Sequence, residues 1–219
     1  MNAHTERRVL DGPAGPLQCA FDGPADSPGL ALLCHPHPLH GGTIDHKVVQ
    51  TLARAFVQLG WRVVRFNFRG VGESAGVWDE GRGEVQDALQ VLAQVRQPGQ
   101  ALALGGFSFG AYVASHVASH VAAQALPSST SPAVHDPACL VLVGPAVETF
   151  AMAPVPAHSL VIHGERDEIV SLQGVLDWAR PQALPVTVVP GAGHFFHGQM
   201  ALLKSLVLRG CRPPGILLP

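Results

Sequence analysis

Short apolar runs recur along this chain, and longer segments with helical periodicity separate them. Most of the runs are apolar on successive residues, as in strands that are buried on both faces of a parallel sheet. Strands are predicted at residues 17–21, 29–34, 62–68, 101–106, 139–144, 159–164 and 186–190. Strand followed by helix, repeated, predicts βαβ units and therefore an α/β fold with one mostly parallel, doubly wound sheet of about seven strands flanked by helices.

The predicted helices follow most of these strands. In residues 45–60 the apolar side chains recur on one face, and Gly60 provides a stop signal. Helices are predicted at residues 45–60, 83–97, 110–126, 171–182 and 197–210. No helical pattern separates the strands at 17–21 and 29–34, so we expect these two strands to be antiparallel.

The bulk composition narrows the possible classes of protein. The chain has 219 residues, 47% of them hydrophobic, which is enough for one domain over residues 1–219 with a substantial core. A net charge of −2 with 14% charged residues offers no basic surface for a nucleic-acid backbone. No apolar run approaches the roughly 18 residues that span a bilayer, and no apolar region follows the first arginines. We therefore expect neither a membrane segment nor a signal peptide.

The four cysteines, Cys19, Cys34, Cys139 and Cys211, are widely scattered and form no CxxC or zinc-site spacing. The first three lie in or beside predicted strands, where a cysteine behaves as a small buried residue. This pattern favours reduced cysteines and a cytoplasmic protein.

A single serine occupies the turn between a predicted strand and a predicted helix. Gly106, Ser108 and Gly110 form the pattern G-x-S-x-G, and this strand–turn–helix context is the one that a nucleophile elbow requires. The glycines remove side chains that would collide with neighbouring backbone, and the helix N-terminus favours negative charge on a reacting oxygen. The alternative is a glycine-rich turn with a solvent-facing serine.

A serine nucleophile needs a base, and the base needs an acid that orients it. Downstream, Asp167 follows the strand at 159–164 and His194 follows the strand at 186–190, in the order Ser, Asp, His. All three residues then lie past the carboxyl ends of parallel strands, which meet at one edge of the sheet. Three rivals remain open: Glu165 and Glu168 for the acid, and His197 for the base.

Acyl transfer also needs two backbone N–H groups directed at the developing oxyanion. One is expected from Phe109, the residue after the serine, and the other from the loop that follows residues 29–34. Pro36 and Pro38 have no N–H group, so His37 is predicted and Leu39 stays open.

The same loop is rich in histidine, which raises the alternative of a metal site at His35, His37, His40 and His46. No cysteine ligand pattern or carboxylate pair accompanies them, and no cofactor or metal is predicted. His116 and His120 share a helical face but lack the glutamate of a zinc-protease motif, so we expect packing or surface roles.

Gly70, Gly72 and Ala75 satisfy the G-x-G-x-x-A pattern of dinucleotide-binding proteins. The next helical pattern begins only near Arg82, and no acidic residue ends a second strand at the expected distance. A structural loop is predicted instead.

Over nearly its whole length the chain resembles the α/β-hydrolase superfamily. The likeness is carried by "HPHPLHGG", "NFRGVGESAG", "GFSFGA", "HGERDEIV" and "GAGH". It is similar to the small, lid-free serine hydrolases and carboxylesterases related to dienelactone hydrolases. The resemblance implies that Ser108 is the nucleophile, Asp167 the acid and His194 the base. Two departures are visible: Asn67 replaces the Asp of a D-x-R-G-x-G-x-S segment, and Ser108 replaces the cysteine of dienelactone hydrolases proper.

Only residues 145–158, with three prolines, connect the strands at 139–144 and 159–164. Many hydrolases insert a helical lid there, and this linker is too short for one. The sequence therefore predicts a serine hydrolase with an open site that takes a small-molecule ester and forms an acyl-enzyme. The alternatives are the same triad acting on thioesters or peptide bonds, and a non-catalytic binding protein with this fold.

Overall fold

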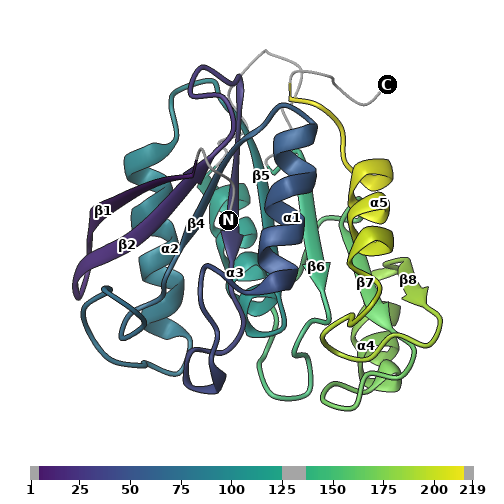
Figure 1. Ribbon diagram of the computed structural model, residues 1–219. Coiled ribbons are helices and arrows are strands. Elements are labelled where there is room, and N and C mark those ends of the chain that lie inside the picture. The colour runs from purple at the N-terminus through teal and green to yellow at the C-terminus, as the bar shows by residue number, and fades with distance from the viewer. Residues whose placement is uncertain (1–4, 125–136, 215–219) are drawn as a thin grey trace.

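The computed structural model describes residues 5–124 and 137–214, and these contain one eight-stranded sheet with helices on both faces (Figure 1). The sheet has the strand order β1-β2-β4-β3-β5-β6-β7-β8. The strands are β1 (Glu6–Gly12), β2 (Gly15–Asp22), β3 (Gly29–Cys34), β4 (Arg62–Phe66), β5 (Ala101–Phe107), β6 (Cys139–Val143), β7 (Leu160–Gly164) and β8 (Val186–Val189). All seven predicted strands are present, and the α/β fold with a mostly parallel sheet is confirmed.

The antiparallel part of the sheet differs from the sequence prediction in two ways. Strand β1 was not predicted, because its sequence ERRVLDG is mostly exposed and lacks a continuous apolar run. Strands β2 and β3 do run in opposite directions, but they are not neighbours: β4 lies between them, antiparallel to β2 and parallel to β3. This order brings β3 against β5 in the middle of the sheet.

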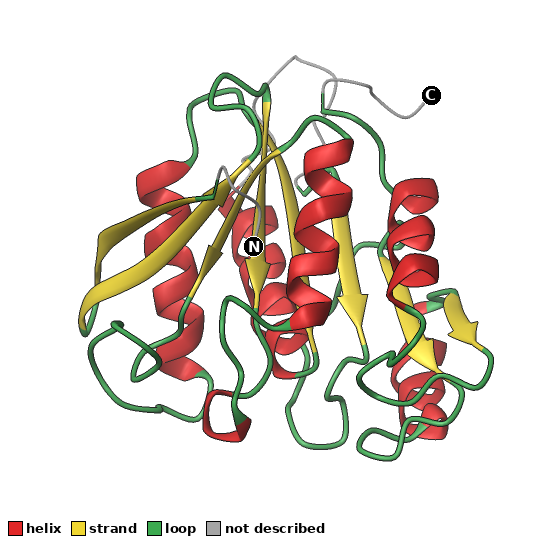
Figure 2. Cartoon of the chain, viewed as in Figure 1, coloured by secondary structure: helices red, strands yellow, loops and turns green. Residues whose placement is uncertain are grey.

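Helices cover the sheet in two layers (Figures 1 and 2). The helices are α1 (Lys47–Gln58), α2 (Arg82–Val95), α3 (Phe109–Gln124), α4 (Leu172–Ala179) and α5 (Met200–Gly210). Apolar residues of α1 and α5 pack on one face with Leu33 and Val141, and those of α2, α3 and α4 pack on the other with Leu32 and Leu142. Successive residues of one strand thus belong to different layers, which is why the strands are apolar throughout.

The linker between β6 and β7, residues 145–158, contains no helix, and residues 5–124 and 137–214 include no lid domain. None of the helices in the described residues is both long and apolar enough to cross a membrane.

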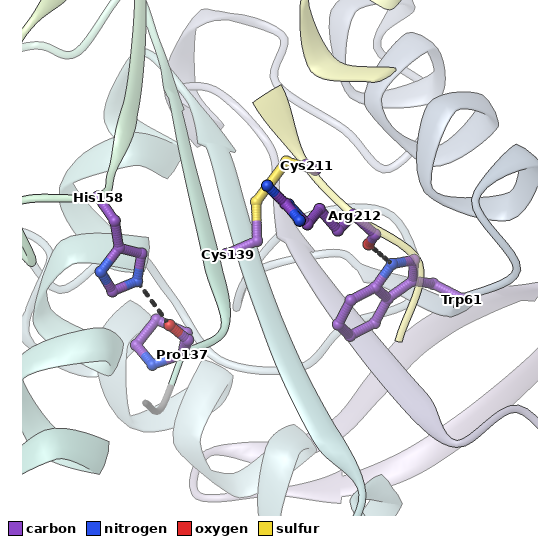
Figure 3. Close-up of a disulfide and its surroundings, with 6 residues drawn as sticks. All are labelled: Trp61, Pro137, Cys139, His158, Cys211 and Arg212. Atoms are coloured by element: carbon purple, nitrogen blue, oxygen red, sulfur yellow. Dashed lines mark hydrogen bonds between the residues drawn. A yellow bond between two sulfur atoms is a disulfide. The ribbon is translucent and has the colours of Figure 1, made fainter. Parts of the chain in front are cut away.

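The cysteines depart from the expectation of a fully reduced protein. Cys139, at the start of β6, and Cys211, directly after α5, form a disulfide (Figure 3). Cys19 and Cys34 are free and buried, as predicted, and burial raises the pKa of the Cys19 thiol to about 12. The sequence could not indicate the pair, because its members are 72 positions apart and only folding brings them together.

Candidate active site

The parallel strands end at one edge of the sheet, the lower edge in Figure 2, and Ser108 lies there between β5 and α3. Its backbone has a positive φ of 56°, a conformation that is strained for a residue with a side chain. Its N–H donates to the carbonyl of Val143 at 2.9 Å, and its carbonyl accepts from Ala111 N–H at 2.9 Å. The half-buried hydroxyl therefore sits on a tight turn that is held from both sides.

The two glycines of the motif are required by close backbone contacts. A Cβ on Gly106 would collide with the carbonyl of Gly110, and one on Gly110 would collide with the carbonyl of Cys34. The G-x-S-x-G spacing is therefore a steric condition for this turn to pack against β3, as the sequence pattern predicts.

Asp167 follows β7, and its side chain is completely buried. Its Oδ1 accepts hydrogen bonds from Ile169 N–H at 2.9 Å and Val170 N–H at 2.8 Å, while Oδ2 lies 2.7 Å from His194 Nδ1. Burial raises the pKa of this carboxyl group, but the hydrogen bond to His194 and the two backbone donors outweigh it, and the net pKa lies below its usual value. Asp167 is therefore a carboxylate directed at the imidazole.

His194 follows β8, and only 2% of it is exposed. Its ring packs on Phe107, the residue before Ser108, with ring centroids 4.8 Å apart. A Cβ added to Gly144, after β6, would lie 3.3 Å from the His194 ring. Since Nδ1 donates to the carboxylate, Nε2 is left as the nitrogen that can accept a proton.

Asp167 and His194 are therefore hydrogen-bonded to each other, and Phe107, the residue before Ser108, packs on the imidazole. Within the described residues, the Ser108 hydroxyl makes no hydrogen bond to His194. Such contacts are often long in unliganded hydrolases and tighten when substrate binds.

The three rivals have other contacts. Glu165 accepts a hydrogen bond from Gly191 N–H at 2.7 Å, and Glu168 accepts one from the backbone N–H of His194 at 3.4 Å. Both exposed carboxylates hold the backbone of the histidine loop, not the imidazole. The exposed His197 stacks on Phe195. The geometry thus favours Asp167 and His194.

The two candidate oxyanion donors can also be compared. Leu39 N–H donates to His37 Nδ1 at 3.2 Å, which caps the short 3₁₀ helix Pro38–His40. This use of the Leu39 donor favours His37 N–H as the second donor beside Phe109, the first residue of α3. The His37 ring lies 5.4 Å from the Phe109 ring, so the two residues adjoin.

Aromatic side chains gather beside these residues. Trp78 packs on His37 at 4.4 Å and on Phe109 at 5.0 Å, and Phe150 lies 4.9 Å from Phe109. Tyr112 completes the group at 5.2 Å from Phe150. All except Phe109 are half-buried, so the surface next to the serine turn is apolar and partly accessible.

The histidine-rich loop does not form a metal site in the part of the chain that the structure describes, where no group of three or more His, Cys, Asp or Glu side chains is arranged to hold an ion. His35 is fully buried between the carbonyl of Pro36, at 2.7 Å, and the N–H of Phe68, at 3.0 Å. Burial lowers its pKa to about 3, so it is neutral. His46 caps α1 by accepting Val48 N–H at 3.3 Å.

The histidines of α3 have local contacts away from the serine turn. His116 Nε2 lies 2.9 Å from the carbonyl of Ala151, and His120 lies beside Gln124 one turn along the helix.

The loop with the G-x-G-x-x-A pattern is held by its own polar residues. Ser74 Oγ donates to the carbonyl of Asn67 at 2.8 Å, and Asn67 Oδ1 accepts Ile44 N–H at 2.9 Å. Arg69 forms an ion pair of 2.7 Å with Asp87 of α2. These contacts agree with the prediction of a structural loop, and α2 begins at Arg82, where the sequence placed it.

One residue near the site was missed in the sequence. His163, on β7, is fully buried, and its Nε2 lies 3.6 Å from Asp167 Oδ2. The signal was present: a histidine interrupts the apolar run SLVIHG immediately before the strand ends.

Comparisons with known proteins show which family this chain resembles in sequence and in fold. The model of a family described as an alpha/beta hydrolase domain matches residues 31–202. The solved structure of a lid-free α/β serine hydrolase from Xanthomonas campestris is 38% identical, covers 96% of this chain and 94% of its own, and superposes with a TM-score of 0.82. An α/β serine hydrolase homologue from Coxiella burnetii is 39% identical, with coverages of 93% and 96% and a TM-score of 0.79. An uncharacterized protein of Rickettsia prowazekii (strain Madrid E) is 32% identical over an alignment of 205 residues, and the match covers 85% of this chain and 80% of that protein.

Proposed function

This chain belongs to the α/β-hydrolase family, and from that premise we propose that it is a serine hydrolase that cleaves small soluble carboxylic esters. The observation that carries the proposal is the 2.7 Å hydrogen bond between buried Asp167 and the imidazole of His194, which packs against the turn of Ser108. The serine hydrolases of Xanthomonas campestris and Coxiella burnetii, similar over almost the whole chain, support the same reaction class.

The proposed roles follow from the Asp167–His194 hydrogen bond and from the position of His194 against the serine turn. His194 Nε2 removes the hydroxyl proton of Ser108 as Oγ attacks the ester carbonyl, and the new C–O bond forms the tetrahedral intermediate. Asp167 holds the imidazole in the tautomer that exposes Nε2 and stabilises its protonated form. When the intermediate collapses, the C–O bond to the alcohol breaks and the imidazolium returns the proton to the leaving alcohol.

The N–H groups of Phe109 and His37 bind the oxyanion. Each such donor contributes about 2.7–4 kcal/mol of transition-state stabilisation in acyl-transfer enzymes. The N-terminus of α3 adds a favourable dipole at the same place. Water then attacks the acyl-enzyme by the same route, with His194 as base, and releases the acid. The chemistry needs no cofactor.

Small esters are favoured because no lid covers the site in the described part of the chain. The partly exposed rings of Trp78, Phe150 and Tyr112 border the serine turn and can contact a short acyl or alcohol group. A long acyl chain needs a deep apolar tunnel, which lidded enzymes supply.

Labelling by a fluorophosphonate probe tests the nucleophile. The native protein is expected to be labelled, and Ser108→Ala is expected to resist labelling and to lose ester hydrolysis. A native protein that is not labelled and hydrolyses no ester would be a binding protein with this fold, contrary to the proposal.

A series of p-nitrophenyl esters tests the substrate class. We expect acetate and butyrate to be cleaved with higher kcat/KM than palmitate. Parallel assays with acyl-CoA and aminopeptidase substrates measure thioester and amide cleavage. A higher kcat/KM on either of these, or on palmitate, would contradict small esters as the substrate.

A further inference from the structure

The buried imidazole of His163 lies next to the carboxylate of Asp167. His163 is on β7, four residues before Asp167, and none of its surface is exposed. Val161 points to the same side of the strand and belongs to the apolar layer under α4, so the position itself suits an apolar side chain.

The hydrogen bonds define the tautomer of His163. Its Nε2 lies 3.0 Å from the carbonyl oxygen of Val170, which can only accept, so Nε2 carries the proton. Nδ1 is then an acceptor, and within the described residues it has no hydrogen-bond partner. Burial lowers the pKa of this histidine, against the opposing effect of Asp167, so the ring is neutral. A buried acceptor without a donor is destabilising, and a phenylalanine here would avoid that cost.

The N–H group on Nε2 has a second neighbour. It lies 3.6 Å from Asp167 Oδ2, the same oxygen that His194 Nδ1 contacts at 2.7 Å. This distance is too long for a hydrogen bond, but the N–H dipole still stabilises negative charge on Oδ2. Val170 closes the arrangement, because its N–H donates to Asp167 Oδ1 while its carbonyl accepts from His163.

We propose that His163 is a positioning residue that lowers the basicity of the triad by sharing Asp167 Oδ2 with His194. The inference rests on the proposed function, in which Asp167 is the acid of the triad. A carboxylate whose charge is partly stabilised by His163 stabilises the imidazolium form of His194 less strongly. The acid limb of the activity profile is therefore expected at lower pH than with an apolar neighbour behind Asp167.

Asp167, His194 and Glu148 act electrostatically on His163, and His46 at the start of α1 acts on His194. Glu148 is exposed and accepts hydrogen bonds from Ser171, at 2.8 Å from N–H and 2.7 Å from the hydroxyl. Glu148 is unchanged in every variant below, so its effect cancels when the variants are compared with the native protein.

The test is the pH dependence of kcat/KM for p-nitrophenyl acetate in His163→Phe and His163→Gln. Phenylalanine keeps the ring shape but has no N–H, and the acid limb of the profile is expected to move up by about half a pH unit. That shift is a roughly threefold loss below the limb and little loss above it. Glutamine carries an amide N–H of similar reach and is expected to restore the native limb. Val161→Ala, on the same side of β7, is the matched control and should lower thermal stability without moving the limb.

An acid limb that stays in place or moves down in His163→Phe overturns the inference. If that variant does not fold, His163→Asn, whose amide is too short to reach Oδ2, must show the same upward shift. The ring titration of His194 by NMR is a readout that does not need turnover, and its midpoint should move with the limb. A native protein without fluorophosphonate labelling would refute the proposed function, whereas intact labelling with an unmoved titration would refute only the role of His163.

Discussion

The two ends of the same parallel sheet are built from different interactions. At the carboxyl end, Ser108 has a strained backbone, Asp167 and His194 meet through one 2.7 Å hydrogen bond, and His163 keeps an unpartnered buried nitrogen. At the amino end, a disulfide and a hydrogen bond to a backbone carbonyl connect the sheet to the segment after α5 (Figure 3). The disulfide links Cys139 to Cys211 there, and Trp61 Nε1 donates to the carbonyl of Arg212 at 2.9 Å.

This difference suggests that the carboxyl end of the sheet governs activity and the amino end contributes to stability. Strain and unsatisfied polar groups persist only where the surrounding structure supports them, and here the layers of α1, α5, α2, α3 and α4 supply that support. The amino end holds the last helix, α5, which follows directly on the loop of His194. Changes at the carboxyl end should therefore reduce activity, and changes at the amino end should reduce stability.

The largest effect is expected for Asp167→Asn. The amide reverses the preferred tautomer of His194, so kcat should fall by about 10⁴-fold while the thermal unfolding temperature changes little. Steady-state kinetics and calorimetry check this outcome. Glu168→Gln is the control, since this exposed carboxylate contacts only the backbone of His194 at 3.4 Å. An equal loss of kcat in Glu168→Gln would contradict the assignment of Asp167 as the acid of the triad.

His37→Pro should have the next largest effect. The φ of His37 is −53°, which proline can adopt, so the substitution removes the N–H group together with the imidazole ring without straining the backbone at this residue. A loss of about 10²–10³-fold in kcat is expected if this donor binds the oxyanion. His37→Ala keeps the N–H and loses the ring and the cap, so its kcat should stay much closer to native. Similar kinetics in both variants would exclude His37 as the donor.

Removing the disulfide tests the other end of the sheet. The double variant Cys139→Ala/Cys211→Ala should lose about 2–4 kcal/mol of unfolding free energy, since a long loop is no longer closed in the unfolded chain. Its kcat at 25 °C should remain native. Urea unfolding and ester hydrolysis measure both quantities, and a reductant should destabilise the native protein but not the double variant. A large loss of kcat would show that the two ends are not independent.

At neutral pH the smallest effect is expected for His35, a buried residue with a structural role although it follows β3 at the carboxyl end. Its folded-state pKa of about 3 lies below the unfolded value, so the unfolded chain binds the proton first. Its contribution to stability is complete above about pH 6.5 and is lost as pH falls towards 3, at about 1.4 kcal/mol per pH unit.

Urea unfolding at several pH values checks this dependence. His35→Gln should flatten the slope between pH 6.5 and pH 4, whereas His120→Gln, on the exposed side of α3, should leave it unchanged. An unchanged slope in His35→Gln would mean that this ring is already charged in the folded protein.

Local sequence patterns were sufficient to predict most of the strands and the turn that carries Ser108. Continuous apolar runs predicted the seven strands, because a strand covered on both faces leaves no polar side. The two glycines around Ser108 predicted a tight turn, because only glycine permits the backbone to approach that closely. Strand β1 escaped detection because its residues are exposed and so carry no burial pattern.

The sequence by itself determined the order of strands and helices, the serine turn, and the order in which a serine, an acid and a histidine follow the strand ends. These features depend on contacts within a few residues, which a local pattern records. Only the tertiary structure decided that β4 separates β2 from β3, that Cys139 meets Cys211, and that Asp167, not Glu165 or Glu168, contacts the imidazole. Each of these depends on groups that are distant along the chain, and their pairing is set by the packing of the whole sheet.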